Sequence, residues 1–333
     1  MEVFSKIYLE EVNRQATENP RKFFRACNTS YERSLKQIVK RVLDEKKQFI
    51  LLTGPSASGK TTTSLKLKQE FLAHGVHAVA ISLDDFFKDR EKVAILPNGK
   101  PDFESPNSLD LARFSDVAKN LLENGFASYH PFDFKKEKGS EKIRRLQFPQ
   151  GSVAIVEGLH ALNPVVFSDL PEDSIFRLFV SVGSAFVNKN EEVVLSPRDV
   201  RLVRRILRDY RFRASDASNT LSLWPGVCQG EEQYIYPFKP FADAMLDTVF
   251  ACEPCQFANM TLLNFTRAAQ NGPLPAEAER LSKSLHLFEH MSQRIIPPSC
   301  VLREFLGGSL YLNKRTLSRR RRAVKPNMDK PKR

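Results

Sequence analysis

The sequence has 333 residues, which is enough for one large α/β domain with appendages or for two modest domains. Hydrophobic residues make up 41% and charged residues 27%, an ordinary balance for a soluble globular protein with a packed core. No apolar run approaches the ~20 residues that span a bilayer, and the N-terminal stretch lacks a secretory apolar region. We therefore expect a cytoplasmic protein with no membrane partner.

The net charge of +12 is concentrated at one end of the chain. Residues 314–333 contain ten Lys or Arg and one Asp, a net charge of +9, so the rest of the chain carries only +3. With its prolines and no apolar period, this tail is predicted to be disordered. A solubilising extension is favoured over contact with RNA, so nucleic acid is not expected as a partner except through the tail.

The elements predicted in chain order begin with a helical segment over residues 1–48, which shows amphipathic spacings of three and four. Four short apolar runs then read as buried strands: FILLT, HAVAISL, SVAIVEG and IFRLFVSV. Helical patterns separate them, for example over about 60–74 and 109–122, which indicates βαβ units and a mainly parallel sheet. An arginine-rich helix follows over 197–212, and ADAMLDTVF is a candidate last strand. We predict a core over 49–270, a C-terminal helical extension over 271–312 and the basic tail over 313–333.

The run GPSASGKT fits the pattern G-x-x-x-x-G-K-[ST] and lies between a predicted strand and a predicted helix. Glycines let backbone N–H groups curl around phosphate oxygens, and the helix N-terminus adds positive potential. The lysine of such a loop reaches the β- and γ-phosphates, and the hydroxyl of its Thr binds Mg²⁺. The pattern predicts a P-loop NTPase fold that binds a nucleoside triphosphate with Mg²⁺. The residues assigned to ATP are Gly54, Pro55, Ser56, Ala57, Ser58, Gly59, Lys60, Thr61 and Thr62, with Lys60 also catalytic and Thr61 a metal ligand.

The loop by itself does not distinguish a GTPase, a motor ATPase and a small-molecule kinase. A GTPase would carry a guanine-reading N-K-x-D, and the NKN at residues 188–190 lacks the Asp. A motor ATPase would favour an apolar strand that ends in Asp or Asp-Glu.

Carboxylates end two of the predicted strands. Asp84 and Asp85 follow the second strand, and Glu157 ends the third. The carboxyl ends of parallel strands line the ligand crevice of an open sheet. Carboxylates there hold Mg²⁺ or accept the proton of a substrate hydroxyl. Asp85 alone could equally cap the start of a helix.

Arginines recur on one face of the predicted helix over 197–212, for which Ser196 is the N-cap and Pro197 the first residue. The members of this face are Arg201, Arg204, Arg205, Arg208 and Arg211. Arginine binds phosphate oxygens in a bidentate manner and stabilises the charge of a phosphoryl-transfer transition state. A solvated basic face is the alternative, but beside a phosphate loop we favour a lid helix.

The order of these motifs resembles the uridine kinase/phosphoribulokinase family, and most of all its bacterial uridine kinase-like nucleoside kinases. The segments that carry the resemblance are GPSASGKT, SLDDFF, PDFESPNSLD, FDF, VAIVEGLHALN, RLVRRILRDYRFR, WPGVCQGEEQYIYPF and LREFLGGS. They run from about residue 49 to residue 310. Related uridine kinases are often oligomers, so a homo-oligomer stays open.

The resemblance implies a role for each matching residue. Asp84 matches the base that acts on the substrate hydroxyl, and Glu157 matches the carboxylate near Mg²⁺. Glu104 stands where uridine kinases bind the ribose hydroxyls. Other substrate positions match Phe103, Phe132 and Phe134, which are available to stack on a base. The arginines implied for catalysis and substrate are Arg205 and Arg208, and those for ATP are Arg204 and Arg213.

Three departures concern the base-reading positions. Uridine kinases have Tyr where this chain has Phe87 and Phe132, and a His where it has Glu137. We still assign these positions to the substrate site. The predicted reaction is transfer of the ATP γ-phosphoryl group to the 5′-hydroxyl of a uridine- or cytidine-like ribonucleoside. The alternatives are a kinase for another alcohol, such as a sugar phosphate or a pantothenate-like compound, and an RNA-associated NTPase.

Overall fold

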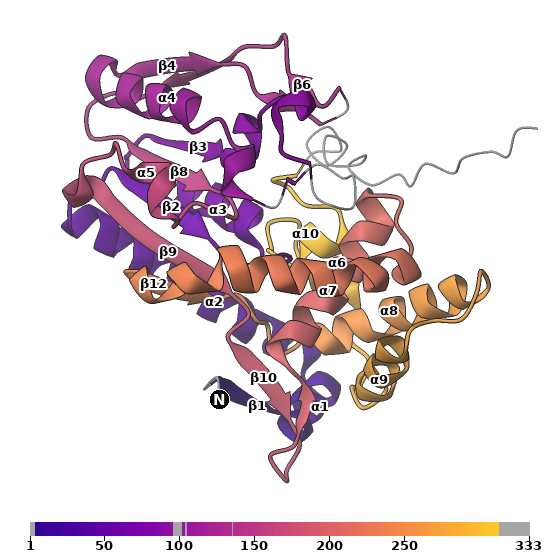
Figure 1. The fold of residues 1–333 in the computed structure, drawn as a ribbon. Helices are drawn as coiled ribbons and strands as arrows, with labels where there is room; N and C mark the ends of the chain where they lie inside the picture. The colour runs from indigo at the N-terminus through magenta and orange to yellow at the C-terminus, as the bar shows by residue number, and fades with distance from the viewer. Residues whose placement is uncertain (1–3, 96–101, 104, 135, 313–333) are drawn as a thin grey trace, which may run out of the picture.

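The computed structural model describes residues 4–95, 102–103, 105–134 and 136–312 (Figure 1). The strands are β1 Ser5–Tyr8, β2 Phe49–Thr53, β3 Ala78–Ser82, β4 Phe126–Tyr129, β5 Phe132–Asp133, β6 Lys138–Gly139, β7 Arg144–Gln147, β8 Val153–Glu157, β9 Ile175–Ser181, β10 Ser184–Val187, β11 Val193–Leu195 and β12 Ala244–Asp247. The α-helices are α1 Leu9–Glu18, α2 Pro20–Asp44, α3 Lys60–Ala73, α4 Leu111–Asn124, α5 Pro164–Phe167, α6 Pro197–Phe212, α7 Ala217–Tyr234, α8 Glu253–Ala269, α9 Ala276–Leu285 and α10 Arg303–Leu306. Short 3₁₀ helices include η1 Leu83–Phe86 and η5 Tyr236–Phe241.

The central sheet has five strands in the order β12-β9-β2-β8-β3, and every neighbouring pair is parallel. This confirms the predicted α/β fold with a parallel sheet flanked by helices. β2 is the middle strand. From it the chain passes to the β3 edge, returns through β8, and then crosses to β9 on the other side. The change of direction lies beside the carboxyl end of β2, which is where open α/β sheets bind ligands.

Both faces of the sheet are covered, because successive residues of a strand point to opposite sides. Ile50 and Leu52 of β2 pack in one apolar cluster with residues of α2 and α3. Phe49 and Leu51 point the other way, into a cluster with residues of α4. Two-sided burial explains why β2 and β8 read as unbroken apolar runs rather than as alternating ones.

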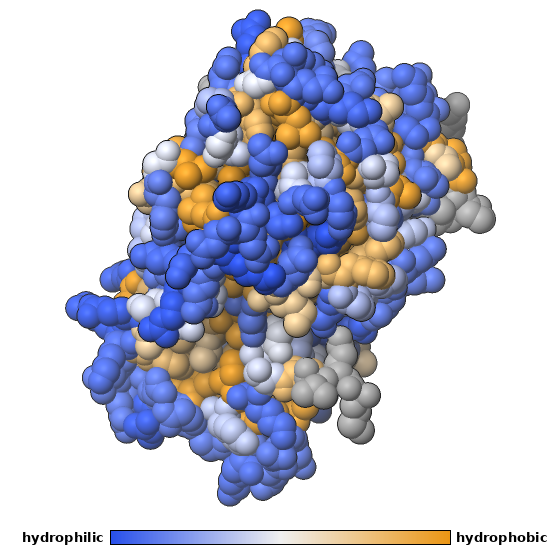
Figure 2. Space-filling model, turned by 90° about the vertical axis from the view of Figure 1, so that its left-hand side faces the viewer, coloured by the Kyte–Doolittle hydropathy of each residue, from blue (hydrophilic) through white to orange (hydrophobic). Residues whose placement is uncertain are grey.

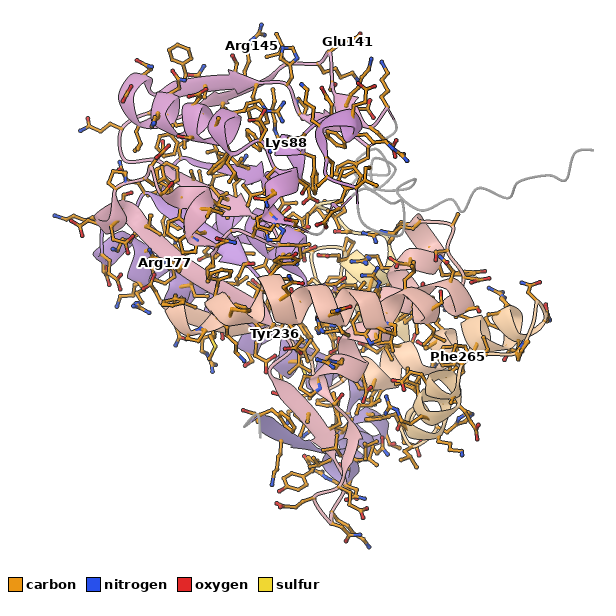
Figure 3. The ribbon with its side chains drawn as sticks, viewed as in Figure 1. Lys88, Glu141, Arg145, Arg177, Tyr236 and Phe265 are labelled. Atoms are coloured by element: carbon orange, nitrogen blue, oxygen red, sulfur yellow. The ribbon has the colours of Figure 1, made fainter. Side chains whose placement is uncertain are left out.

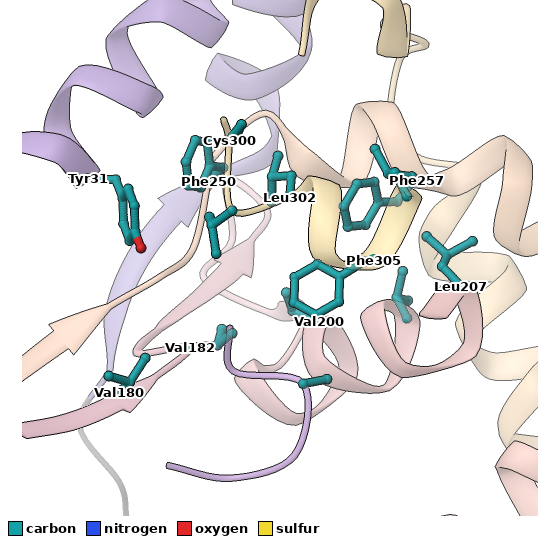
Figure 4. Packing of buried hydrophobic residues seen from close by; sticks show 14 of the residues in the cluster. Tyr31, Val180, Val182, Val200, Leu207, Phe250, Phe257, Cys300, Leu302 and Phe305 are labelled. Carbon is teal, nitrogen blue, oxygen red and sulfur yellow. The ribbon is translucent and has the colours of Figure 1, made fainter. Parts of the chain in front are cut away.

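The first cluster extends beyond the sheet into the C-terminal helices. Phe250, Phe257 and Phe305 are buried in it together with residues of α6 (Figure 4). Helices α6 to α10 gather at one end of the sheet (Figure 1). The predicted extension over 271–312 is therefore packed into the body of the molecule.

The N-terminal segment differs from its prediction at its start. Ser5–Tyr8 is a strand rather than helix, and it pairs in parallel with β10. β10 leaves β9 by a two-residue step and offers an open edge, which β1 fills, so tertiary pairing overrides the local helical pattern. Helix then runs from Leu9 and, after a break at Asn19, through α2.

The hairpin β4–β7 lies above the sheet and carries charged side chains, with Glu141 and Arg145 at its outer edge and Lys88 below them (Figure 3). On the face shown in Figure 2, hydrophobic residues are exposed in separate patches, with hydrophilic residues between them. Within the described part of the chain, no helix combines the length and apolarity needed to cross a bilayer.

We predict that Tyr31→Phe lowers the free energy of unfolding by about 1 kcal/mol. The Tyr31 hydroxyl lies 2.9 Å from Thr63 Oγ1 in the interior, and this bond ties α2 to α3. Urea unfolding followed by circular dichroism measures the change. Tyr8→Phe is the control, since the Tyr8 hydroxyl bonds Glu191 at the surface and its loss should change little. Equal effects of both variants would contradict the prediction.

Candidate active site

The loop between β2 and α3 can form only with glycine at two places. A Cβ on Gly54 would lie 1.9 Å from the carbonyl oxygen of Val180. Gly59 has φ +88°, and a Cβ there would lie 2.9 Å from Val301. The loop is thus packed between β9 and the C-terminal segment, and it ends at Gly59, the N-cap of α3.

A cavity of about 190 Å³ lies at this loop. Its lining brings together most of the predicted residues from separate parts of the chain: the loop residues Ser56, Ala57, Ser58, Gly59, Lys60 and Thr61, the carboxylates Asp84 and Glu157, and the arginines Arg205, Arg208 and Arg213. Gly54 and Pro55 lie behind the lining, where their carbonyl oxygens accept bonds of 2.6 and 2.9 Å from Lys60 Nζ. The lysine is thus folded back on its own loop.

The two acids at the cavity lie on different elements: Glu157 is the last residue of β8, and Asp84 lies in η1 after β3. β8 lies beside β2, and Ser82 Oγ donates to Glu157 Oε1 at 2.9 Å. Asp85, the neighbour of Asp84, has a structural role: it accepts bonds from the Tyr129 hydroxyl (3.1 Å) and from Arg144 (2.6 Å). Asp85 therefore anchors the β4–β7 hairpin.

The residues proposed for Mg²⁺ fit this metal by their chemistry. Thr61 and Glu157 both line the cavity and offer a hydroxyl and a carboxylate oxygen. Mg²⁺ prefers oxygen ligands and is bound through one or two protein groups plus substrate phosphates. Glu157 is 5% exposed, and its bond from Ser82 ties its carboxylate to the end of β3.

Asp209 orients the cavity arginines. Its carboxylate lies 3.0 Å from Arg208, 3.3 Å from Arg205 and 3.4 Å from Arg213. Burial alone would raise the pKa of Asp209, but the three arginine charges outweigh it and lower that pKa below its ordinary value. One buried carboxylate thus holds three guanidinium groups toward the cavity.

Arg204 does not line the cavity, contrary to its assignment to ATP. Its guanidinium is 0% exposed and binds Glu253, Thr248 and the carbonyl oxygen of Ala57. Arg201 is likewise buried, against Glu231. Helix α6 is therefore part of the packed body rather than a separate lid. Its predicted start is confirmed, because Ser196 and Asp199 form a capping box with Pro197 at the first position.

Two glutamates at the cavity were not predicted as site residues. Glu304 of α10 accepts the backbone N–H of Thr62 at 3.1 Å, so this amide, which was assigned to ATP, is already bonded. Glu231, a buried residue of α7, accepts the N–H of Ser56 at 2.7 Å. The segments GEE and LREFLGGS were visible in the sequence, but their contacts with the loop cross 175 and 242 residues.

The predicted aromatic substrate residues form one cluster. Phe87 follows η1, and its ring centroid lies 5.6 Å from Phe103 and 5.8 Å from both Phe132 and Phe134. Phe132 is buried, while the other three rings are half-buried. Nearby, the carboxylate of Glu137 binds Arg90 at 2.5 Å.

Glu104, assigned to the ribose, lies outside the described residues. None of the four rings belongs to the cavity lining, so the cluster is a separate apolar surface that begins three residues after Asp84.

Comparison with known proteins shows what the segment that carries this site is similar to. Residues 49–180 match the model of the Phosphoribulokinase / Uridine kinase family. The chain is thus similar to that family over this segment. Curated relatives include a uridine kinase of Clostridium novyi, 24% identical over 60% of this chain and 86% of its own, and one of Streptococcus gordonii, 27% identical over 60% and 85%.

Among solved structures, a possible uridine kinase from Bacillus stearothermophilus is similar with TM-score 0.43 and 15% identity, covering 64% of this chain and 97% of that one. A D-glycerate 3-kinase from Cryptococcus neoformans aligns with TM-score 0.34 and 17% identity, over 77% and 88%. The family match and the curated relatives support an enzyme with phosphotransferase activity, and the matched segment contains the loop, both strand-end acids and the aromatic cluster.

We predict that Asp209→Asn makes the free energy of unfolding of this protein less dependent on pH under acidic conditions. A carboxyl whose folded pKa is lowered stabilises the native state above its unfolded pKa, and this contribution is lost as the pH falls through the folded pKa. The wild-type protein should therefore lose stability between about pH 5 and pH 3 more steeply than the variant. Urea unfolding at several pH values measures both slopes. Asp116→Asn, an exposed change on α4, is the control. Identical slopes in wild type and Asp209→Asn would contradict the assignment.

Proposed function

We propose that this kinase transfers the γ-phosphoryl group of ATP to the 5′-hydroxyl of a ribonucleoside. The observation that carries the proposal is that Asp84 lines the phosphate-loop cavity while the aromatic cluster begins at Phe87, three residues along the chain. A base bound at the cluster would direct its sugar toward Asp84. The matched curated relatives, which are named uridine kinases, support the same substrate class.

In this proposal each group at the cavity has one task. Lys60 leaves the carbonyl oxygens of its loop to bind the β- and γ-phosphates, joined by the loop N–H groups. Thr61 and Glu157 hold Mg²⁺, which supplies charge neutralisation at the phosphates when bound. Arg205 and Arg208 stabilise the transferring group, and Arg213 contacts ATP. Asp84 orients the acceptor hydroxyl and takes its proton.

The acceptor side is built to stack on a base rather than to read its edge. Phe87, Phe103 and Phe134 are half-buried rings, and any base has a face that can stack on them. The carboxylate of Glu137 is engaged by Arg90, at the position where uridine kinases have a His. We therefore expect weak discrimination among bases, because few polar groups would be left unpaired by a wrong one.

ADP release across a panel of acceptors tests the proposal. With ATP and Mg²⁺, ribonucleosides should stimulate ADP release, and the kcat/KM values of uridine, cytidine and the purine nucleosides should differ by less than about 100-fold. The panel also contains sugar phosphates and pantothenate. Turnover with one of these and with no nucleoside would replace the proposal by a kinase for another alcohol.

We predict that Asp84→Asn lowers kcat by about 100-fold or more, since a positioned general base contributes at least that much. Affinity for Mg·ADP, measured by isothermal titration calorimetry, should stay close to the wild-type value because Asp84 serves the acceptor. Asp116→Asn again serves as the exposed control. Full turnover in Asp84→Asn would show that another group takes the proton.

A further inference from the structure

The outward side of the phosphate loop is held by side chains from α6 and from the residue after β12. Arg201 donates to the carbonyl oxygen of Ser56 at 3.2 Å, and Arg204 donates to that of Ala57 at 3.4 Å. Thr248 Oγ1 donates to the carbonyl oxygen of Ser58 at 2.8 Å. Three consecutive loop carbonyls thus face away from the cavity and have donors there.

One ion pair holds both backbone groups of Ser56. Arg201 binds Glu231 with two parallel bonds of 2.8 and 2.7 Å, and the two side chains are 2% and 3% exposed. Glu231 Oε1 also accepts the Ser56 N–H at 2.7 Å, while Arg201 donates to the Ser56 carbonyl oxygen. The peptide groups on either side of Ser56 are therefore fixed from α6 and α7 together.

Burying this ion pair costs desolvation free energy, so its presence calls for a reason other than core packing. Removing two charges from water costs free energy that burying a hydrophobic pair of the same volume does not. A buried ion pair is therefore weak evidence for stability. A loop without helix or strand partners needs donors and acceptors for its peptide groups. Arg201 and Glu231 supply both at the position where the loop begins to curl.

We infer that Arg201 and Glu231 are positioning residues that hold the phosphate loop in its nucleotide-binding conformation before the nucleotide arrives. The Trp224 ring supports the pair from α7, with the Arg201 guanidinium carbon 5.3 Å from its centroid. Holding the loop beforehand lowers the ordering cost of binding and so strengthens nucleotide affinity. The inference rests on the proposed use of a nucleotide, but not on which acceptor is phosphorylated.

The chain contains a matched control pair between the same two helices. Arg198 binds Glu232 at 2.6 Å, also from α6 to α7, but these side chains are 50% and 58% exposed and do not touch the loop. The variants to compare are Arg201→Gln and Glu231→Gln with Arg198→Gln and Glu232→Gln. Circular dichroism and urea unfolding first establish that each variant is folded.

Two measurements on the nucleotide-free and Mg·ADP-bound enzyme test the inference. Mg·ADP affinity should fall about tenfold or more in Arg201→Gln and Glu231→Gln and stay unchanged in the two controls. Hydrogen–deuterium exchange of the peptide that spans residues 54–60 should be faster in the first two variants without nucleotide, and ADP should slow it again. A merely structural pair would lower the unfolding midpoint and leave both readouts unchanged.

If the glutamine variants do not fold, Arg201→Lys tests the same inference. Arg201→Lys retains the buried charge but cannot hold Glu231 with two parallel bonds and reach Ser56 as well. It should show the same direction of change in loop exchange and in ADP affinity. Unchanged exchange and affinity in folded Arg201→Lys would overturn the inference. ADP binding needs no acceptor. If no nucleoside stimulated ADP release, the proposed substrate would be wrong, but the inference about Arg201 and Glu231 would be unaffected.

Discussion

The site depends on one backbone constraint: a loop that turns its N–H groups toward a phosphate turns its carbonyl groups away from it. In most turns, water or a neighbouring strand satisfies such carbonyls. Here the outer side of the loop is buried under α6 and the C-terminal segment, so side chains must supply the donors. Arg201, Arg204 and Thr248 do so, and their own charges are balanced by Glu231 and Glu253. The burial of α6 follows from this arrangement.

Helix α6 consequently carries arginines of two kinds on one face. Arg201 and Arg204 bind the loop from outside, while Arg205 and Arg208 line the cavity. Asp209 balances Arg205 and Arg208, together with Arg213 just after α6, by sharing its carboxylate among the three guanidinium groups. Because all of these groups are partly or fully buried, an exchange of Arg for Lys is not conservative at any of them.

Local signals in the sequence predicted most of the fold. The apolar runs at β2, β8 and β9, the loop glycines and the Ser196 cap act within a few residues, so their patterns are readable. The partners of the arginines could not be predicted in this way. Helical spacing puts Arg201, Arg204 and Arg205 on one face, but only tertiary packing decides which meets Glu231, which meets Glu253 and which reaches the cavity. The same holds for β1, whose partner strand lies about 180 residues away.

The supports of the loop lie far along the chain from the loop itself. Glu231 and Thr248 come 175 and 190 residues after the loop residues that they bind. Val301 presses on Gly59 and Glu304 binds Thr62, both from about 240 residues further along the chain. During synthesis, a ribosome-bound fragment that ends at residue 180 holds the whole family segment and none of these supports. Contacts of such long range slow folding, because their loop-closure entropy must be lost before they form. A nascent chain therefore lacks the full set of contacts that hold its phosphate loop until residue 304 has been made.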